Sequence, residues 1–163
     1  MSRLEDLIHR FTVQKSHLDR AIALCKDIEG LVIEVGLGSG RSFDHLREKL
    51  NNNPIFTFDY RVETHPGCAP REEQCILGDI EETLPKFSNS RSGQAALIHM
   101  DIGTKKYDED IVLYQKLTPA IIKLMAPKAL LVSDRPISDQ SLKELEPFGA
   151  NHPWKYFSYQ KNF

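Results

Sequence analysis

Residues 31–41 read LVIEVGLGSGR, a short apolar run that passes directly into three glycines. A β-branched run with almost no polar alternation is typical of a strand that is covered on both faces in a parallel sheet. Glycine has no side chain, so Gly36, Gly38 and Gly40 let the backbone turn tightly and let a ligand approach it closely. We therefore expect a buried strand at Leu31–Val35, followed by a ligand-binding turn and a helix.

Helical and extended patterns alternate on both sides of this turn. Apolar residues recur at three- and four-residue steps over residues 3–28, which predicts an amphipathic helix. Further helices are expected at 42–50, from Gly78-Asp79 onward, at 108–125 with a break or restart near Pro119, and at 138–146. Further strands are expected at 55–58, 75–77, 95–100, 128–133 and 154–159. This order predicts an α/β fold with a doubly wound, mostly parallel sheet and helices on both faces.

The length and charge of the chain limit how many domains it forms and which partners it binds. A chain of 163 residues fits one domain of ordinary size, so we expect residues 1–163 to form a single domain. The net charge is −2, and acidic and basic residues are interleaved. Such a surface has no electrostatic footprint for a nucleic-acid backbone, so we expect no nucleic-acid partner.

The cysteines and the N-terminus indicate a cytoplasmic protein without a metal. Cys25, Cys68 and Cys75 are odd in number and show no C-x-x-C spacing, which argues against a disulfide framework and a metal site. The N-terminus is too acidic for a signal peptide, and no apolar run reaches the roughly 18 residues of a membrane span. We expect a cytoplasmic protein that does not bind membranes.

The spacing of the glycines separates two kinds of nucleotide site. A dinucleotide fingerprint, G-x-G-x-x-G, needs a glycine where this chain has Arg41. The chain follows G-x-G-x-G instead, with the acidic Glu34 two positions before the first glycine. This pattern resembles the first motif of class I S-adenosylmethionine-dependent methyltransferases. The resemblance implies a Rossmann-like fold, S-adenosylmethionine as cofactor, and contacts to it from Glu34, Gly36, Leu37, Gly38, Ser39, Gly40 and Arg41.

Two later acidic positions match the same family. Asp59 ends the second strand, where a carboxylate can accept hydrogen bonds from both ribose hydroxyls of a nucleoside, although a nicotinamide cofactor would use it equally. The resemblance implies that Asp79 contacts the adenine amino group and that Ile80 packs on the ring. Asp79 with Glu82 three residues later is also a helix N-cap with its capping-box partner. Both interpretations stay open at Asp79.

Asp101 and Asp134, which follow two later strands, are the catalytic candidates. The resemblance places Asp101 near the sulfonium and the methionyl ammonium, and the sequence around it lacks the Asn-Pro-Pro-Tyr signature of amino- or DNA-methylating relatives. Asp134 lies just past a strand end, where a base for the acceptor is needed; His65 is another candidate. His99 lies within an apolar strand, which favours a hydrogen-bonded core histidine.

The resemblance also implies that the helix within residues 1–29 packs over the cofactor cleft, so that Gln14 or His17 lines an acceptor pocket. The chain after Ser133 is too short for the usual helix and two strands, which predicts a trimmed C-terminal edge. We therefore expect methyl transfer by in-line displacement to a small-molecule acceptor, whose site is small or completed by a second subunit. The alternatives are an NAD-dependent oxidoreductase and a non-catalytic S-adenosylmethionine-binding protein.

Overall fold

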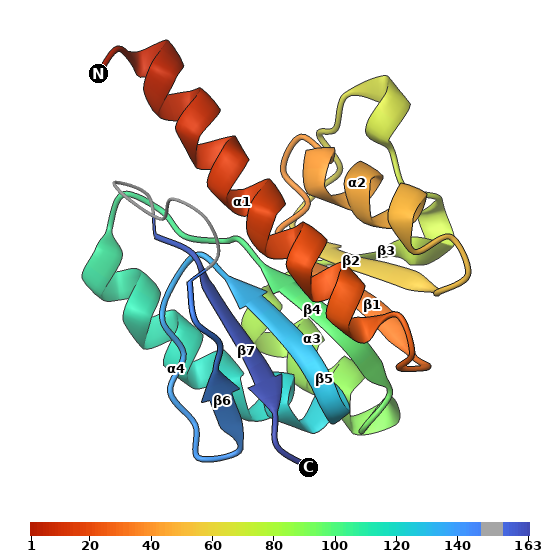
Figure 1. The fold of residues 1–163 in the computed structure, drawn as a ribbon. Helices are drawn as coiled ribbons and strands as arrows, with labels where there is room; N and C mark the ends of the chain where they lie inside the picture. Colours follow the sequence, from red (N-terminus) through yellow and green to blue (C-terminus); the bar gives the residue numbers. More distant parts are fainter. Residues whose placement is uncertain (148–154) are drawn as a thin grey trace.

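The computed structural model describes residues 1–147 and 155–163, which form one central sheet with helices on its two faces (Figure 1). The helices are α1 (Arg3–Cys25), α2 (Arg41–Lys49), α3 (Ile80–Ser90) and α4 (Tyr107–Leu124). The strands are β1 (Leu31–Val35), β2 (Ile55–Asp59), β3 (Cys75–Leu77), β4 (Ala95–Met100), β5 (Met125–Ser133), β6 (Leu142–Glu144) and β7 (Phe157–Lys161). Single 3₁₀ turns at Pro66–Cys68 and Glu72–Gln74 lie between β2 and β3.

The seven strands are ordered β3-β2-β1-β4-β5-β7-β6. Strands β1 to β5 pair in parallel, and β7 pairs antiparallel with both β5 and β6. The predicted doubly wound, mostly parallel sheet is thus confirmed. The strand order reverses between β1 and β4. Strands β2 and β3 are added on one side of β1, and β4 and β5 are then added on its other side. Open α/β sheets bind ligands beyond the carboxyl ends of the strands at such a point.

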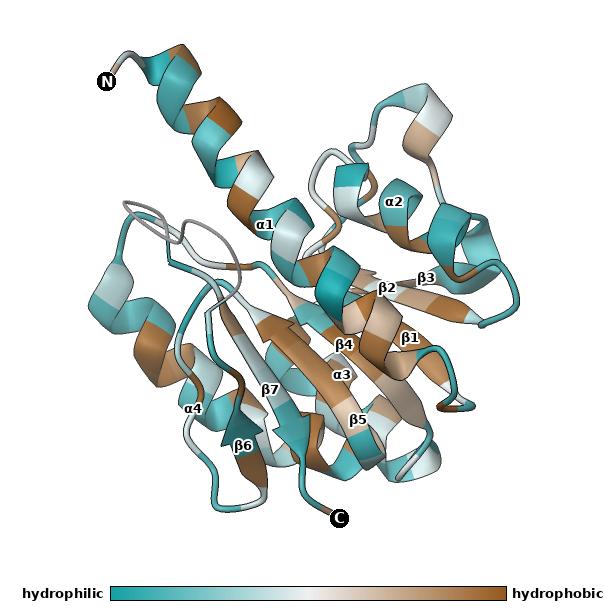
Figure 2. Cartoon of the chain, in the orientation of Figure 1, coloured by the Kyte–Doolittle hydropathy of each residue, from teal (hydrophilic) through white to brown (hydrophobic). Residues whose placement is uncertain are grey.

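Apolar side chains fill the space on both faces of the sheet. Leu97 of β4 packs in a cluster with α1 and α2, whereas Ile98 packs in a second cluster with α3 and α4. This alternation follows from the strand backbone, which directs successive side chains to opposite faces. Figure 2 shows the apolar central strands between helices whose outer surfaces are largely hydrophilic. The sheet is therefore a rigid support for loops at its carboxyl edge.

Helix α1 crosses the sheet, and its N-terminal half extends beyond the body of the molecule (Figure 1). Ser2 and Glu5 form a capping box that satisfies free backbone N–H groups at its start. Val13, Leu18 and Ala21 are buried further along the helix. None of the helices among the described residues is long and apolar enough to cross a membrane.

Helix α4 runs without interruption through Pro119, so the expected break there is wrong. Proline removes one backbone donor from a helix. One residue before the proline, the hydroxyl of Thr118 donates to the Tyr114 carbonyl at 2.7 Å. Burial of Tyr114, Leu117 and Ile121 against the sheet holds the helix across this position.

The C-terminal edge differs from the prediction in two ways. The helix expected at 138–146 is wrong, because Leu142–Glu144 form β6 in antiparallel pairing with β7. The Asp139 carboxylate accepts hydrogen bonds from the backbone and the hydroxyl of Ser141, a turn that leads the chain into β6. The strand expected at 154–159 begins later, at Phe157, and Trp154 lies outside the described residues. Within residues 134–147 and 155–163 the chain after β5 thus contains both final strands and no helix.

Candidate functional site

The three glycines of the loop after β1 have different surroundings. A side-chain carbon on Gly36, at φ 95°, would lie 2.3 Å from the Asp101 carbonyl oxygen, and one on Gly40, at φ 82°, would lie 2.8 Å from the Cys68 carbonyl oxygen. A carbon on Gly38, at φ 50°, would meet no atom within 4 Å. Two of the glycines therefore allow close packing of the protein, and Gly38 leaves the surface of the loop open.

Asp59 at the end of β2 holds this loop in place. One of its carboxylate oxygens accepts hydrogen bonds from the backbone N–H groups of Leu37 at 3.0 Å and Gly38 at 3.1 Å. Its other oxygen accepts from the N–H of Tyr60 at 2.7 Å. Beside it lies the first cavity, of about 580 Å³, which is lined by Gly38, Ser39, Asp59, Tyr60, Arg61 and Glu63.

A second cavity, of about 220 Å³, adjoins the first at Gly38 and Ser39. It lies between the glycine loop, the start of α2, the end of β4 and helix α1, which contributes Arg10, Phe11 and Gln14. Gln14, which is expected at an acceptor pocket, lines this second cavity. His17 is instead buried, with its Nδ1 2.7 Å from the Ser158 hydroxyl.

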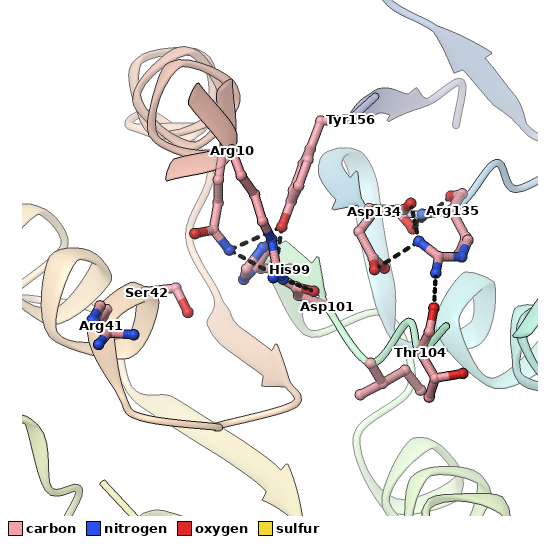
Figure 3. A network of polar contacts seen from close by, with 12 residues as sticks. Arg10, Arg41, Ser42, His99, Asp101, Thr104, Asp134, Arg135 and Tyr156 are labelled. Atoms are coloured by element: carbon pink, nitrogen blue, oxygen red, sulfur yellow. Dashed lines mark hydrogen bonds and ion pairs between the residues drawn. The ribbon is translucent and has the colours of Figure 1, made fainter. Parts of the chain in front are cut away.

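Three segments of the chain meet in the second cavity at Asp101, which directly follows β4 (Figure 3). Its carboxylate accepts hydrogen bonds from the Gln14 amide at 2.8 Å and the Tyr156 hydroxyl at 2.6 Å. A guanidinium nitrogen of Arg10 lies 3.4 Å from the other carboxylate oxygen of Asp101. Burial and the charge of Asp101 raise the pKa of Tyr156 well above its usual value, so this tyrosine remains a neutral donor.

Glu34 lies behind the glycine loop and is fully buried. Its carboxylate accepts a hydrogen bond from the Ser42 hydroxyl in the first turn of α2 and lies 2.8 Å from His99 Nδ1. Burial lowers the pKa of His99, but the charge of Glu34 and its hydrogen bond outweigh burial, so that the net shift is upward. The pair therefore connects β1, β4 and α2 directly beneath the loop, and His99 is a hydrogen-bonded core histidine.

A third cavity, of about 250 Å³, shares Arg10 and Gly103 with the second cavity. Asp134, after β5, lines it and bonds to the Tyr114 hydroxyl and, at 3.1 Å, to the Arg135 guanidinium. Burial and the charge of Asp101 raise the pKa of Asp134 to about 6. A carboxylate with this pKa is ionised near neutral pH and is a stronger base than an exposed aspartate.

The remaining candidates lie at the rim of these cavities or away from them. Asp79 is the N-cap of α3, and its carboxylate accepts from the Glu81 N–H at 2.9 Å, so the expected cap forms but the expected capping box with Glu82 does not. The adjacent Ile80 packs against the core. Arg41 is exposed, donates to the Ser39 hydroxyl and stacks over Phe11 at 5.2 Å. The His65 ring accepts a hydrogen bond from the Gly67 N–H.

Two of the site residues were not predicted. Arg10 lies one helical turn before Gln14, so the i, i+4 spacing that places both on one face of α1 was a usable signal. Tyr156 offered no such signal, because its contact with Asp101 depends on β7 pairing next to β5. Among the described residues, no group of three or more His, Cys, Asp or Glu side chains is placed to hold a metal ion.

The joined cavities suit an elongated ligand with different chemistry at its two ends. Asp59 already accepts three N–H bonds, and a carboxylate has about four acceptor positions, so capacity remains for a hydroxyl donor. Asp101, at the other end, presents a carboxylate to an ammonium group. Near it, the start of α2 offers free backbone N–H groups, which favour an anion.

Comparison with known proteins agrees with this geometry. A family model described as S-adenosyl-L-methionine methyltransferase matches residues 1–161. The crystal structure of an S-adenosyl-L-methionine methyl transferase from Silicibacter pomeroyi DSS-3 is 33% identical, with 99% of each chain covered and a TM-score of 0.91. A comparison with curated proteins gives no match.

More distant structures share the fold. A protein from Corynebacterium glutamicum is 12% identical, with 99% of this chain and 88% of that chain covered and a TM-score of 0.63. A 16S rRNA (adenine(1408)-N(1))-methyltransferase with cosubstrate SAM from Catenulisporales acidiphilia is 12% identical, with 88% and 89% covered and a TM-score of 0.52. At this identity the likeness is one of fold alone.

The family match decides among the functions left open by the sequence. The expected cofactor, S-adenosylmethionine, and the expected enzyme class are confirmed, and the alternatives of an NAD-dependent oxidoreductase and a binding-only protein are not retained. The glycine loop, the two carboxylates beside it and the match over nearly the whole chain lead to one conclusion. This chain belongs to the S-adenosyl-L-methionine methyltransferase family.

Proposed function

We propose that this methyltransferase acts on a small-molecule acceptor by in-line displacement. The observation that carries the proposal is the third cavity, which adjoins Asp101 and the second cavity through Arg10 and Gly103. Its volume of about 250 Å³ is below the range of about 300–1,000 Å³ that is typical of pockets for drug-sized ligands. The space suits a compact acceptor.

The first cavity holds the adenosine part of the cofactor in this proposal. Asp59 accepts a hydrogen bond from a ribose hydroxyl, and the open surface at Gly38 allows the nucleoside to lie against the loop. Asp79 and Ile80, at the end of β3 next to β2, border the adenine. Glu34 supports the glycine loop from beneath it, because its bonds to Ser42 and His99 fix the end of β1 and the start of α2.

The second cavity holds the methionyl part. Asp101 receives the ammonium group, and the N–H groups of Arg41 and Ser42, in the first turn of α2, receive the carboxylate. Gln14 and Tyr156 keep Asp101 oriented. We propose that residues 1–163 act as one cofactor-binding unit, in which the N-terminal helix within residues 1–29 closes this end of the cleft.

S-adenosylmethionine supplies a methyl group that is already activated on a cationic sulfur. The protein therefore mainly has to hold the acceptor in line and exclude water, and positioning of this kind is worth about 7–11 kcal/mol of a barrier. Asp134 receives the proton of the acceptor, since it lines the third cavity and is ionised near neutral pH. Asp101 lines the second cavity, on the other side of Arg10 and Gly103, and orients the cofactor there.

The class of acceptor is tested with methyl-labelled S-adenosylmethionine. The purified protein is incubated with RNA, protein and small-metabolite fractions of a cell extract, and label in each fraction is measured. We expect label in a small metabolite that chromatography separates from unreacted S-adenosylmethionine, and none in such a metabolite with a Gly38→Val variant as control. Label only in RNA or only in protein would contradict the proposal, and the RNA result would follow the distant rRNA methyltransferase of the same fold.

A further inference from the structure

Most of the charged residues that line the third cavity, which we call the acceptor cavity, are basic. Four of its eight lining residues are basic, and one is acidic. The basic residues are Arg10, Lys105, Arg135 and Lys155, and the acidic residue is Asp134. A hollow with an excess of one charge attracts a ligand of the opposite charge.

The two arginines of the acceptor cavity already have acidic partners. Arg135 bonds to Asp110 at 2.7 Å and to Asp134 at 3.1 Å, and it also donates to the Thr104 carbonyl at 2.7 Å. Its guanidinium is thereby fixed as part of the cavity wall. Arg10 lies 3.4 Å from Asp101 at the boundary with the second cavity. The positive charge of each arginine is therefore already partly neutralised by a carboxylate of the protein.

Lys105 and Lys155 differ from the arginines in this respect. Within residues 1–147 and 155–163, neither ammonium group has a hydrogen bond or an ion pair. Lys105 lies in the loop between β4 and α4, and Lys155 lies just before β7, so the two charges reach one cavity from different segments. Lysine ammonium groups bring three donors each and no acceptor, which suits an anionic oxygen group.

Building on the proposed function, we infer that the methyl acceptor is a small carboxylate, which Lys105 and Lys155 bind by its anionic group while its nucleophilic oxygen or nitrogen faces Asp134. A carboxylate fits better than a phosphate monoester. The phosphate carries about −1.5 to −2 charges near pH 7 and would lie close to the carboxylates of Asp134 and Asp101.

The reaction balances with these residues. The acceptor oxygen or nitrogen bonds to the methyl carbon as the carbon–sulfur bond breaks, and the electron pair of that bond stays on sulfur, which becomes neutral. The proton of the acceptor passes to the Asp134 carboxylate. Lys105 and Lys155 keep their protons throughout, since their part is to bind the carboxylate.

The inference is tested by binding of an unreactive probe to the protein saturated with S-adenosylhomocysteine, the demethylated cofactor. Benzoate and benzamide have nearly the same shape and differ in charge, and their affinities are measured by calorimetry. We expect benzoate to bind and benzamide to bind about fivefold more weakly, which is the scale expected from the loss of two exposed charge pairs. Lys105→Met and Lys155→Met should each weaken benzoate binding severalfold and leave the affinity for S-adenosylhomocysteine unchanged.

The matched control is Lys86→Met, which removes one exposed positive charge on α3, on the opposite face of the sheet from α1. It should bind benzoate as the wild type does. Equal binding of benzoate and benzamide, or unchanged benzoate binding in both lysine variants, would overturn the inference. Stronger binding of inorganic phosphate than of benzoate, with loss in the same variants, would overturn the assignment to a carboxylate. Failure of S-adenosylhomocysteine to bind would instead count against the proposed function.

Discussion

At the scale of the residue, Gly38 and Gly93 form a natural comparison. Both have positive φ, 50° and 70°, and a side-chain carbon on either would meet no atom within 4 Å. Gly38 lies between the first and second cavities, whereas Gly93 lies in the turn between α3 and β4. A substitution at either position therefore brings similar backbone strain, of about 1–2 kcal/mol, and only one of them reaches the cofactor.

We predict that Gly38→Val abolishes binding of S-adenosylmethionine and that Gly93→Val leaves it unchanged. The valine side chain at Gly38 fills the open surface on which the nucleoside lies. Calorimetry gives the affinity, and a denaturant midpoint for each variant shows that both remain folded. Wild-type affinity in Gly38→Val would mean that the loop does not carry the cofactor.

A second prediction at this scale concerns the pH dependence of the reaction. Because the pKa of Asp134 is about 6, kcat/KM should rise with pH up to that value and level off above it, as the carboxylate becomes able to accept a proton. Asp134→Asn should lower kcat/KM by about 10²–10⁴-fold, the usual contribution of a positioned base. The variant should also lose the rise near pH 6.

The control for Asp134→Asn is Asp27→Asn, which removes an exposed carboxylate at the opposite edge of the sheet. Its pH profile should match that of the wild type. If Asp134→Asn kept the rise near pH 6, another group would be the base.

At the scale of the element, the buried pair of Glu34 and His99 joins β1 to β4 at directly paired positions. The Ser42 hydroxyl adds the first turn of α2 to the same contact. Since the pKa of His99 is raised in the folded protein, the folded state binds this proton more tightly than the unfolded state does. The resulting stabilisation is complete below the unfolded pKa of about 6.5 and is lost as pH rises through the folded value.

We therefore predict that the free energy of unfolding falls as pH rises above about 6.5, and that this fall is smaller in His99→Gln and in Glu34→Gln. The second variant keeps the shape of the glutamate and removes its charge. Urea titrations at several pH values measure the effect. A fall of unchanged size in both variants would show that another group causes it.

The elements also show how far sequence reasoning extends. The strand ends at Asp59, Asp101 and Asp134 were predictable, because a buried run followed by a polar residue marks the edge of a parallel sheet. Residues 138–146 were assigned to a helix from local pattern, but their structure depends on pairing with β7, which is distant in sequence. The contact between Tyr156 and Asp101 depends on that same pairing. Local periodicity contains no information about such partners.

At the scale of the whole molecule, the cofactor acts as a stabilising ligand. Binding to the folded state alone, at 100 times the dissociation constant, adds about 2.7 kcal/mol to the free energy of unfolding. For a protein of this size, each 1 kcal/mol raises the melting temperature by about 2–4 °C.

Saturating S-adenosylmethionine should thus raise the melting temperature by roughly 5–11 °C, whereas NAD should leave it unchanged. Differential scanning calorimetry on the same preparation compares the two. Gly93→Val should keep the rise and Gly38→Val should lose it. An equal rise with NAD would contradict the assignment of the cofactor.

The hydrogen bonds of Asp101 have a consequence for how the enzyme is made. Gln14 and Tyr156, which both donate to this carboxylate, are 87 and 55 positions away from it along the chain. A ribosome synthesises the glycine loop well before it reaches Tyr156. A nascent chain therefore carries the loop before it can complete the anchor beside it.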